Sequence, residues 1–347
     1  MSKIIVKAFA FLIAFLVCAI SAKSADLIEW GDTVALETER PASWARMVKL
    51  KNGDWLAAYA VFGDPDGTRI RIKKSTDNMR SWSFLTEFGE KGRNLDNANL
   101  IRLSGGDILL SMRSLTDQKS YRVQVCKSSD GGRNFSFLSV IDANEKPLGE
   151  ENVGVWEPFL IELSPKKIAA FYANEMHSRS DPSFSQTISE RISTDGGRTW
   201  GEEIRAVAEA GAARPGEPNV IRLPNKKYLL FYEVCGSEDC AGHFSVSDDG
   251  ETWSKKIGPE IPDVFQNPQG IALDDRIWIV TSNNAQVIYT TDGGKLWKKN
   301  RPAFKFSSWG AFYRTDRDEI ALVTGTKNEK SQRNKLMIRF GKFAPPK

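Results

Sequence analysis

A short pattern that returns five times constrains this chain more than any other feature of its sequence. The clearest copy, residues 193–200, reads Ser-Thr-Asp-Gly-Gly-Arg-Thr-Trp. Weaker copies are residues 75–82 with Asp77, 128–135 with Asp130, 246–253 with Asp248, and 290–297 with Asp292. Each follows a short alternating apolar run, and aspartate and glycine close tight turns between strands. The spacing therefore predicts an architecture of repeated β-hairpins.

A second repeat precedes each of these turns. Apolar runs at 46–50, 99–103, 159–163, 219–223 and 269–273 are each followed by a polar turn and another apolar run. A sixth unit lacks the aspartate turn but keeps a hairpin at 311–324, with 335–340 as an outer strand and 27–36 completing its sheet. We therefore expect an all-β fold, a six-bladed β-propeller of four-stranded antiparallel blades that forms a single domain over residues 25–347.

The repeated turn resembles the Asp box, also called the BNR repeat, of sialidases and related β-propellers. In that family the box lies between the two outer strands of each blade, away from the active site. The resemblance implies that aspartates such as Asp195 support turns and take no part in catalysis.

The first 24 residues have the features of a secretory signal peptide. Lys3 and Lys7 precede an apolar run over residues 8–20, and small residues at 21–25 offer a cleavage site. We expect a secreted or periplasmic protein whose mature form is not inserted in a membrane. Removal of this segment lowers the formal net charge from +4 to about +1, which favours neither nucleic acid nor an anionic surface as partner. A monomer is expected.

Cysteine and histidine are too sparse to predict a metal site. Cys235 and Cys240 are close enough to close a small disulfide loop in an oxidising compartment, while Cys126 has no evident partner. The chain has only two histidines, so a zinc site is not expected. Signatures of metal, nucleotide or flavin binding are absent from the sequence, and we expect no cofactor.

Alignment of the repeats shows which residues converge near the propeller axis. The start of the first strand and the end of the second strand of every blade lie at the same face. These positions hold Trp44, Arg46, Asn97, Asn99, Glu157, Glu217, Asn219, Asn267, Gln269 and Trp309, and then Tyr59, Arg113, Glu175, Glu233, Ser282 and Asn283. Polar groups that converge between aromatic walls suit a carbohydrate site. Glycoside hydrolysis uses two carboxyl groups, and Glu157, Glu175, Glu217 and Glu233 all fall in blades three and four.

Several of these residues have a second interpretation. Glu157 and Glu233 can form an axial ion pair with Arg46 or Arg113, and Glu217 can simply accept hydrogen bonds from the backbone. Trp44 and Trp309 can be core residues or sugar platforms. Tyr313, on the same sector, can contact substrate or pack inward.

The motifs Val-Trp-Glu-Pro at 155–158 and Tyr-Glu-Val-Cys-Gly at 232–236 resemble the exo-1,5-α-L-arabinanase glycoside hydrolases, which are sialidase-like propellers that act with retention. The similarity extends from about Trp44 to Trp309. It implies that Glu233 is the nucleophile and Glu157 the general acid/base, with Glu175 as the substitute. The substrate would then be a neutral furanoside oligo- or polysaccharide.

Two other functions stay open. An exo-sialidase would need three arginines to hold the sialate carboxylate, and here only Arg46 and Arg113 occupy axial positions. A non-catalytic propeller that binds glycans or assembles with partners is the other alternative, since a fold does not fix a function.

Overall fold

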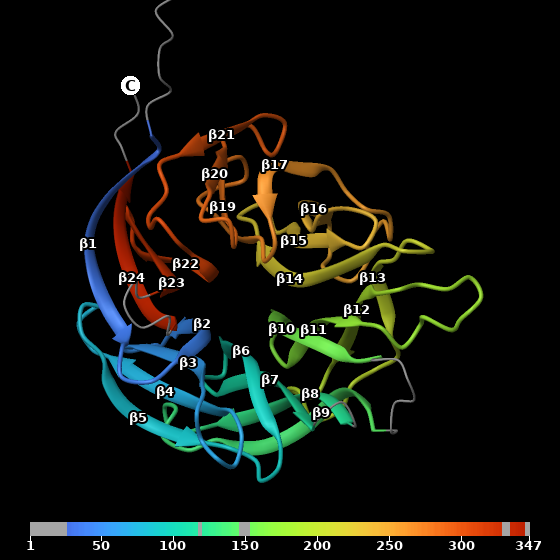
Figure 1. The fold of residues 1–347 in the computed structure, drawn as a ribbon, viewed down its shortest axis with the longest axis horizontal. Coiled ribbons are helices and arrows are strands. Elements are labelled where there is room, and N and C mark those ends of the chain that lie inside the picture. Colours follow the sequence, from blue (N-terminus) through green and yellow to red (C-terminus); the bar gives the residue numbers. More distant parts are fainter. Residues whose placement is uncertain (1–25, 117–119, 146–152, 328–333, 344–347) are drawn as a thin grey trace, which may run out of the picture.

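The computed structural model describes residues 26–116, 120–145, 153–327 and 334–343. The predicted signal peptide, residues 1–24, lies outside them. Every regular element among these residues is a strand, so they contain no helix that is long and apolar enough to cross a membrane. The strands form six four-stranded antiparallel sheets, which Figure 1 shows arranged around a common axis. The predicted all-β, six-bladed propeller is confirmed.

Blades one to five are each built from four strands that follow one another in the chain, with the first strand nearest the axis. Blades one to three consist of β2 (Ala42–Lys49), β3 (Trp55–Val61), β4 (Arg69–Ser75) and β5 (Ser83–Phe88); β6 (Asn94–Arg102), β7 (Ile108–Thr116), β8 (Ser120–Ser128) and β9 (Ser136–Asn144); and β10 (Val155–Ser164), β11 (Lys167–Asn174), β12 (Thr187–Ser193) and β13 (Ile204–Val207).

Blades four to six complete the ring. They consist of β14 (Arg214–Arg222), β15 (Tyr228–Cys235), β16 (Ala241–Ser247) and β17 (Glu260–Phe265); β18 (Gln269–Ala272), β19 (Trp278–Thr281), β20 (Val287–Thr290) and β21 (Trp297–Asn300); and β22 (Ser308–Asp316), β23 (Glu319–Lys327), β24 (Asn334–Phe343) and β1 (Ile28–Glu37). The N-terminal strand β1 thus pairs with β24 as the outermost strand of blade six, as the sequence predicted.

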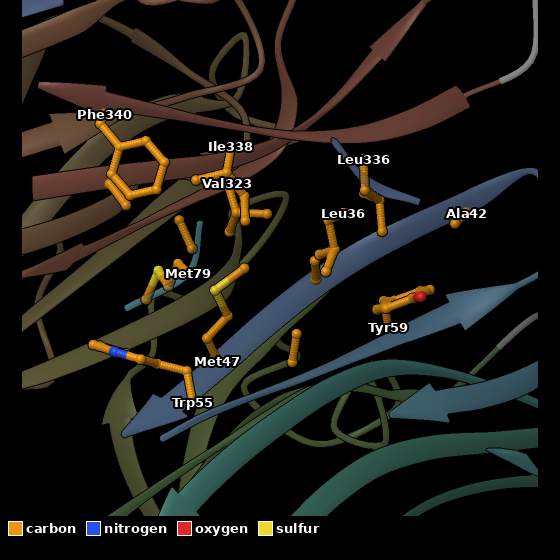
Figure 2. Close-up of a cluster of buried hydrophobic side chains, with 14 of the residues drawn as sticks. Leu36, Ala42, Met47, Trp55, Tyr59, Met79, Val323, Leu336, Ile338 and Phe340 are labelled. Carbon is orange, nitrogen blue, oxygen red and sulfur yellow. The ribbon is translucent and has the colours of Figure 1, made fainter. Parts of the chain in front are cut away.

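The hydrophobic core consists of separate clusters, each shared by two neighbouring blades. Figure 2 shows the cluster at the seam between blades six and one, to which Leu36, Met47 and Leu336 belong. A buried carboxylate reinforces this seam. Glu37 of β1 accepts hydrogen bonds from the Tyr59 hydroxyl (3.0 Å) and from Arg71 Nη1 (2.8 Å) of blade one. Strand β1 is therefore held in place by both apolar packing and an ion pair.

The aspartates of the repeated turns bind the turns that contain them. In blade three, Asp195 Oδ1 accepts the Ser193 hydroxyl (2.8 Å) and the backbone N–H groups of Arg198 (2.9 Å) and Thr199 (3.0 Å). Equivalent bonds occur at Asp77, Asp130 and Asp292. These carboxylates lie between the third and fourth strands of their blades, at the periphery of the ring.

The predicted aspartate of the fourth turn is wrong by one residue. Asp249, not Asp248, accepts the Ser247 hydroxyl (3.0 Å) and the N–H of Thr252 (2.7 Å). This turn is one residue shorter than the others, so counting back from Trp253 points to Asp248. The side chain of Asp248 is 83% exposed and pairs with Lys227 instead. The turn aspartate is identified by the hydroxyl residue two positions before it. Ser247 provides this hydroxyl for Asp249, whereas Val246 cannot provide one for Asp248.

Candidate active site

The innermost strands all carry a residue in the left-handed backbone conformation at the same place. These residues, with φ between 47° and 57°, are Trp44, Asn97, Glu157, Glu217, Asn267 and Trp309. In five blades the pairing of the first two strands shifts at this residue, which marks a β-bulge. A left-handed residue other than glycine costs about 1–2 kcal/mol, and such strain clusters at functional sites. A bulge changes the direction in which a side chain points. The six left-handed residues therefore present their side chains at one face of the propeller.

Four of these bulge residues line one small cavity of about 20 Å³ between the blades. Trp44, Asn97, Glu157 and Glu217 contribute to its wall. The residues two positions further along three of the strands, Arg46, Asn99 and Gln269, line it as well. The predicted convergence of the aligned positions is therefore observed for these seven residues.

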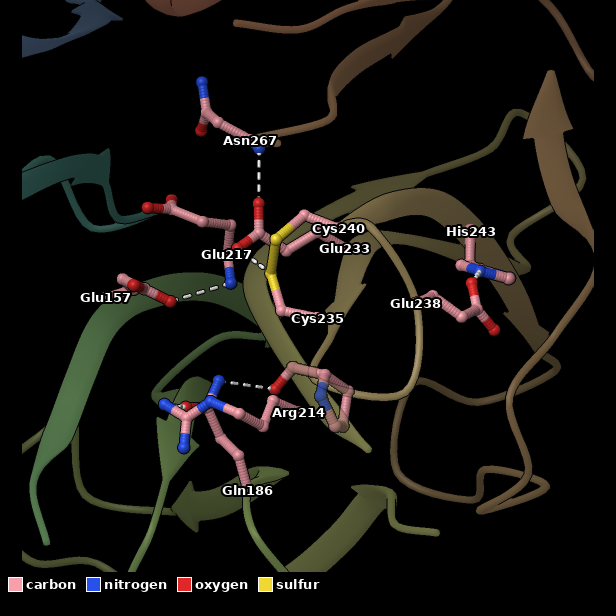
Figure 3. The surroundings of a disulfide bond; sticks show 11 residues. Glu157, Gln186, Arg214, Glu217, Glu233, Cys235, Glu238, Cys240, His243 and Asn267 are labelled. Carbon is pink, nitrogen blue, oxygen red and sulfur yellow. Dashed lines mark hydrogen bonds and ion pairs between the residues drawn. A yellow bond between two sulfur atoms is a disulfide. The ribbon is translucent and has the colours of Figure 1, made fainter. Parts of the chain in front are cut away.

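The backbone N–H groups of two of the left-handed residues are each bound by a carboxylate of the preceding blade. Glu157 Oε2 accepts the N–H of Glu217 (2.8 Å), and Glu233 Oε2 accepts the N–H of Asn267 (2.6 Å). Figure 3 shows both bonds, with the three glutamates facing one another from neighbouring strands. The N–H of Trp309 binds Asn283 Oδ1 (2.6 Å) in the same way. The carboxylates are thus held by the backbone and not by a flexible partner.

Burial and neighbouring carboxylates raise the pKa of all three glutamates. Burial raises the pKa of Glu233 to about 7, with a further contribution from the charge of Glu157. Burial, together with the charges of Glu157 and Glu233, raises the pKa of Glu217 well above its ordinary value. The pKa of Glu157 is raised by burial too, although the N–H of Glu217 opposes this. The cluster therefore retains protons at pH values where isolated glutamates have lost them.

Glu175 lies beside this cluster in a different environment. Its Oε1 accepts a hydrogen bond from Arg214 Nη2 (2.5 Å), and its Oε2 accepts the N–H of Gly154 (2.7 Å). Arg214 also donates to Gln186 Oε1 (2.8 Å). The side chain of Glu175 is buried. The Glu175 carboxylate is therefore held by an arginine and by the backbone, and not by the other three glutamates.

The two predicted axial arginines do not pair with the glutamates. Arg113 forms a two-pronged ion pair with Asp96, at 2.6 and 2.5 Å, and its guanidinium lies 4.7 Å from the Trp156 ring centre. Arg46 donates to the carbonyl oxygens of Ala45 (3.0 Å) and Trp309 (3.1 Å). The alternative interpretation of Glu157 and Glu233 as partners in an ion pair with these arginines is wrong.

An aromatic wall stands on one side of the cavity. Trp44 packs against Trp309 and Phe62, with ring centres 5.7 and 5.8 Å apart. Three buried polar atoms nearby, Trp44 Nε1, Asn97 Oδ1 and Asn267 Nδ2, have no hydrogen-bond partner among the residues that the structure describes. Such unpartnered polar atoms are uncommon in protein interiors.

Other predicted ligand contacts have structural roles or lie elsewhere. Asn99 Oδ1 accepts the N–H of Leu160 (3.0 Å), which ties blade two to blade three. Tyr59 is fully buried at the seam between blades six and one. The Tyr313 hydroxyl accepts the N–H of Met47 (2.8 Å), and its ring lines the hollow at the opposite end of the innermost strands. The structure does not bring these two tyrosines to the glutamates.

Sequence reasoning missed the residues that position the predicted ones. Asp96, Arg214, Gln186 and Trp156 were not predicted as site residues, because their partners come from other strands or loops. The sequence offers a signal for two of them: Asp96 directly precedes the aligned Asn97, and Trp156 lies in the motif at 155–158. The Cys235–Cys240 disulfide forms beside Glu233 (Figure 3), with Cys235 Sγ 3.4 Å from Glu233 Oε1. Cys126 is a free, buried thiol.

The fold is a six-bladed β-propeller that carries a carboxyl cluster near the start of its innermost strands. No protein-family model matches the chain, and no curated protein matches it by sequence. The structure is similar to an α-L-arabinanase of Penicillium chrysogenum complexed with arabinobiose, with a TM-score of 0.79 and 19% identity over 90% of this chain and 98% of the other.

Two further structures show the range of this fold. A GH93 α-L-arabinofuranosidase of Fusarium graminearum with arabinobiose has a TM-score of 0.75 and 18% identity, covering 90% of this chain and 98% of the other. The NanB sialidase of Streptococcus pneumoniae has a TM-score of 0.62 and 11% identity, covering 88% and 70%. The resemblance to sialidase-like propellers close to the arabinanases is confirmed as a likeness of fold.

Proposed function

We propose that this protein is an exported, retaining glycoside hydrolase that removes units from the end of a neutral furanoside polysaccharide, with arabinan as the favoured substrate. The observation that carries the proposal is the cluster of Glu157, Glu217 and Glu233, in which backbone N–H groups hold two carboxylates in fixed positions. Retaining glycosidases need one carboxyl group that is protonated and one that is ionised. A cluster in which burial and neighbouring carboxylates raise the pKa values can supply that combination.

The proposed roles follow from the contacts of each carboxyl group. Glu233 attacks the anomeric carbon while Glu157 gives its proton to the departing oxygen; water then releases the sugar from Glu233 with Glu157 as base. The hydrogen bond from the Asn267 N–H favours the ionised form of Glu233. Glu175 is the weaker candidate for the acid, because Arg214 binds its carboxylate. Glu217 remains a group that contacts the sugar.

The arginines favour a neutral sugar over sialic acid. Asp96 neutralises Arg113 through two hydrogen bonds, and Arg46 is engaged by two backbone carbonyls. Recognition of a sugar carboxylate requires arginines that are free to bind it. The Trp44 and Trp309 wall and the unpartnered amide atoms of Asn97 and Asn267 suit an uncharged ring with hydroxyl groups. The Cys235–Cys240 disulfide agrees with export to an oxidising compartment.

The test is product analysis after incubation with linear debranched arabinan and, separately, with a sialylated oligosaccharide. We expect arabinose or short arabinose oligomers from the first substrate alone, released with the anomeric configuration retained in an NMR time course. Release of sialic acid would contradict the proposal and would show that the protein acts as a sialidase. Absence of both products would favour either another furanoside substrate or a non-catalytic glycan-binding protein. A glycan-binding screen distinguishes these two alternatives.

Glu233→Gln is expected to lower turnover of arabinan by at least about a thousandfold, because nucleophile and base act as a unit. Its thermal unfolding should stay close to that of the wild type. Glu260→Gln, an exposed position on a strand of the same blade, is the matched control and should keep full activity. Unchanged hydrolysis by Glu233→Gln would remove the nucleophile assignment.

A further inference from the structure

The end of the propeller channel opposite the glutamates carries its own repeated pattern. Five residues after each left-handed residue, the innermost strands place Lys49, Arg102, Glu162, Arg222, Ala272 and Arg314 at equivalent positions. The three arginines belong to β6, β14 and β22, which are the innermost strands of alternate blades. They are therefore spaced around the axis with approximate threefold symmetry. Five residues of strand separate this belt from the glutamates by about 16 Å.

The positive charge of this belt is not neutralised within the described part of the chain. Arg102 Nε donates to the Lys49 carbonyl (3.1 Å), and Arg314 Nη2 donates to the Arg317 carbonyl (2.6 Å). Arg222 lies over the Tyr228 ring at 5.7 Å. No described carboxylate forms an ion pair with any of the three arginines. The belt thus presents three guanidinium groups that have no ion-pair partner among the described carboxylates.

The one acidic residue of the belt is already occupied. Glu162 accepts the N–H of Ser104 at Oε2 (2.7 Å) and the Ser104 hydroxyl at Oε1 (2.9 Å). These bonds hold the carboxylate against the neighbouring blade. It reduces the positive potential of the belt but leaves all three arginines unpaired.

An apolar surface lies directly inside the arginines. The residue before each belt position is Val48, Ile101, Ile161, Ile221, Ile271 or Tyr313. Five of these six, together with Phe159 and Phe312, line a hollow of about 580 Å³ whose rim contains Arg102, Arg222 and Arg314. This volume is in the range of small-molecule sites, which are largely apolar with a few polar groups that fix orientation.

We propose that this hollow binds an amphipathic organic anion, a carboxylate that carries an acyl chain. The carboxylate lies among Arg102, Arg222 and Arg314, and the apolar chain packs on the isoleucines of the innermost strands. Charge complementarity selects the anion, since a guanidinium pairs with a carboxylate through two parallel hydrogen bonds. Burial of the chain supplies the remaining affinity. The site is separate from the axial glutamates and does not depend on the function proposed for them.

The test is calorimetric titration of the folded protein with decanoate, below its micelle concentration and at low salt. We expect saturable binding of one decanoate per chain. The triple variant Arg102→Ala/Arg222→Ala/Arg314→Ala is expected to weaken it at least tenfold. The matched control, Arg133→Ala/Arg198→Ala/Lys295→Ala, removes the same charge from exposed positions on three of the aspartate turns and should bind as the wild type does.

Two further ligands separate charge from apolar contact. Decanol and decyltrimethylammonium carry the same chain without the anion, and both should bind the wild type at least tenfold more weakly than decanoate does. Glu233→Gln, at the other end of the channel, should leave decanoate binding unchanged. Equal binding of decanol and decanoate, or full decanoate affinity in the triple variant, would overturn the proposal.

Discussion

Glu190 is a fully buried carboxyl group between blades three and four, and its replacement by glutamine gives a measurable test of the core. Burial raises its pKa to about 8 from an ordinary value of 4.5, although a hydrogen bond from the Trp253 indole opposes the shift. That bond joins Trp253 Nε1 to Glu190 Oε2 at 3.1 Å. The other oxygen, Oε1, has no hydrogen-bond partner in the described part of the chain. The folded protein therefore holds a proton on Glu190 at neutral pH.

The sign and size of the effect follow from proton linkage. The folded state binds the Glu190 proton more tightly than the unfolded chain does. The stability that protonated Glu190 contributes is therefore complete below pH 4.5 and is lost as the pH rises toward 8. Each pH unit in this window costs about 1.4 kcal/mol, so a change from pH 5.5 to 7.5 costs about 2.7 kcal/mol from Glu190 alone. For a folded chain of about 320 residues this corresponds to a change of about 4 °C in Tm.

The assay is thermal unfolding of wild type and Glu190→Gln at pH 5.5 and 7.5. Glutamine can still accept the Trp253 N–H but does not titrate, so the Tm of the variant should fall by about 4 °C less over this interval than that of the wild type. A hydrogen bond that glutamine gains or loses shifts the Tm by the same amount at pH 5.5 and at pH 7.5. It therefore does not affect the comparison. Glu260→Gln, an exposed control, should keep the wild-type dependence. Equal pH dependence in Glu190→Gln and wild type would refute the reasoning.

Three other perturbations test the axial site, the turns and the ring closure. In Glu157→Gln the pKa of Glu233 should fall below about 7, because burial remains but the charge of Glu157 is gone. A ¹³C NMR titration of the glutamate side chains measures this pKa. An unchanged pKa would disprove the electrostatic coupling between the two residues. Asp249→Ala should lower the free energy of unfolding by about 1–2 kcal/mol, because its turn hydrogen bonds are lost. Asp248→Ala should leave chemical denaturation almost unchanged. A larger loss of stability in Asp248→Ala would mean that Asp248 is the turn aspartate after all. Glu37 has a pKa of about 2, since hydrogen bonds and Lys73 outweigh its burial, so the stability it contributes is present above pH 4.5 and lost as the pH falls toward 2. Glu37→Gln should therefore lower the free energy of unfolding at pH 7 by about 3 kcal/mol, with Glu29→Gln on the same strand as a control that leaves urea unfolding unchanged.

The sequence by itself determined the elements that depend on local chemistry. The aspartate turns were readable because each carboxylate binds groups within four residues of itself, as Asp195 does with Ser193 and Thr199. The blade order followed from the repeat of strands and turns, and closure by β1 followed from the unit that lacked its own outer strand. Alignment of the repeats also predicted that Trp44, Asn97, Glu157 and Glu217 lie together, because equivalent positions of a propeller share one face.

Only the tertiary structure decided which partner each charged group has. Arg113 binds Asp96, and Glu175 binds Arg214, 39 residues later in the chain. The left-handed bulges were equally invisible, because residues such as Glu157 and Trp309 do not favour that conformation. Their strain is held by the pairing of whole strands, and two of their N–H groups then fix Glu157 and Glu233. Burial and mutual repulsion, which set the proton affinity of the glutamates, arise only when neighbouring blades close around one axis.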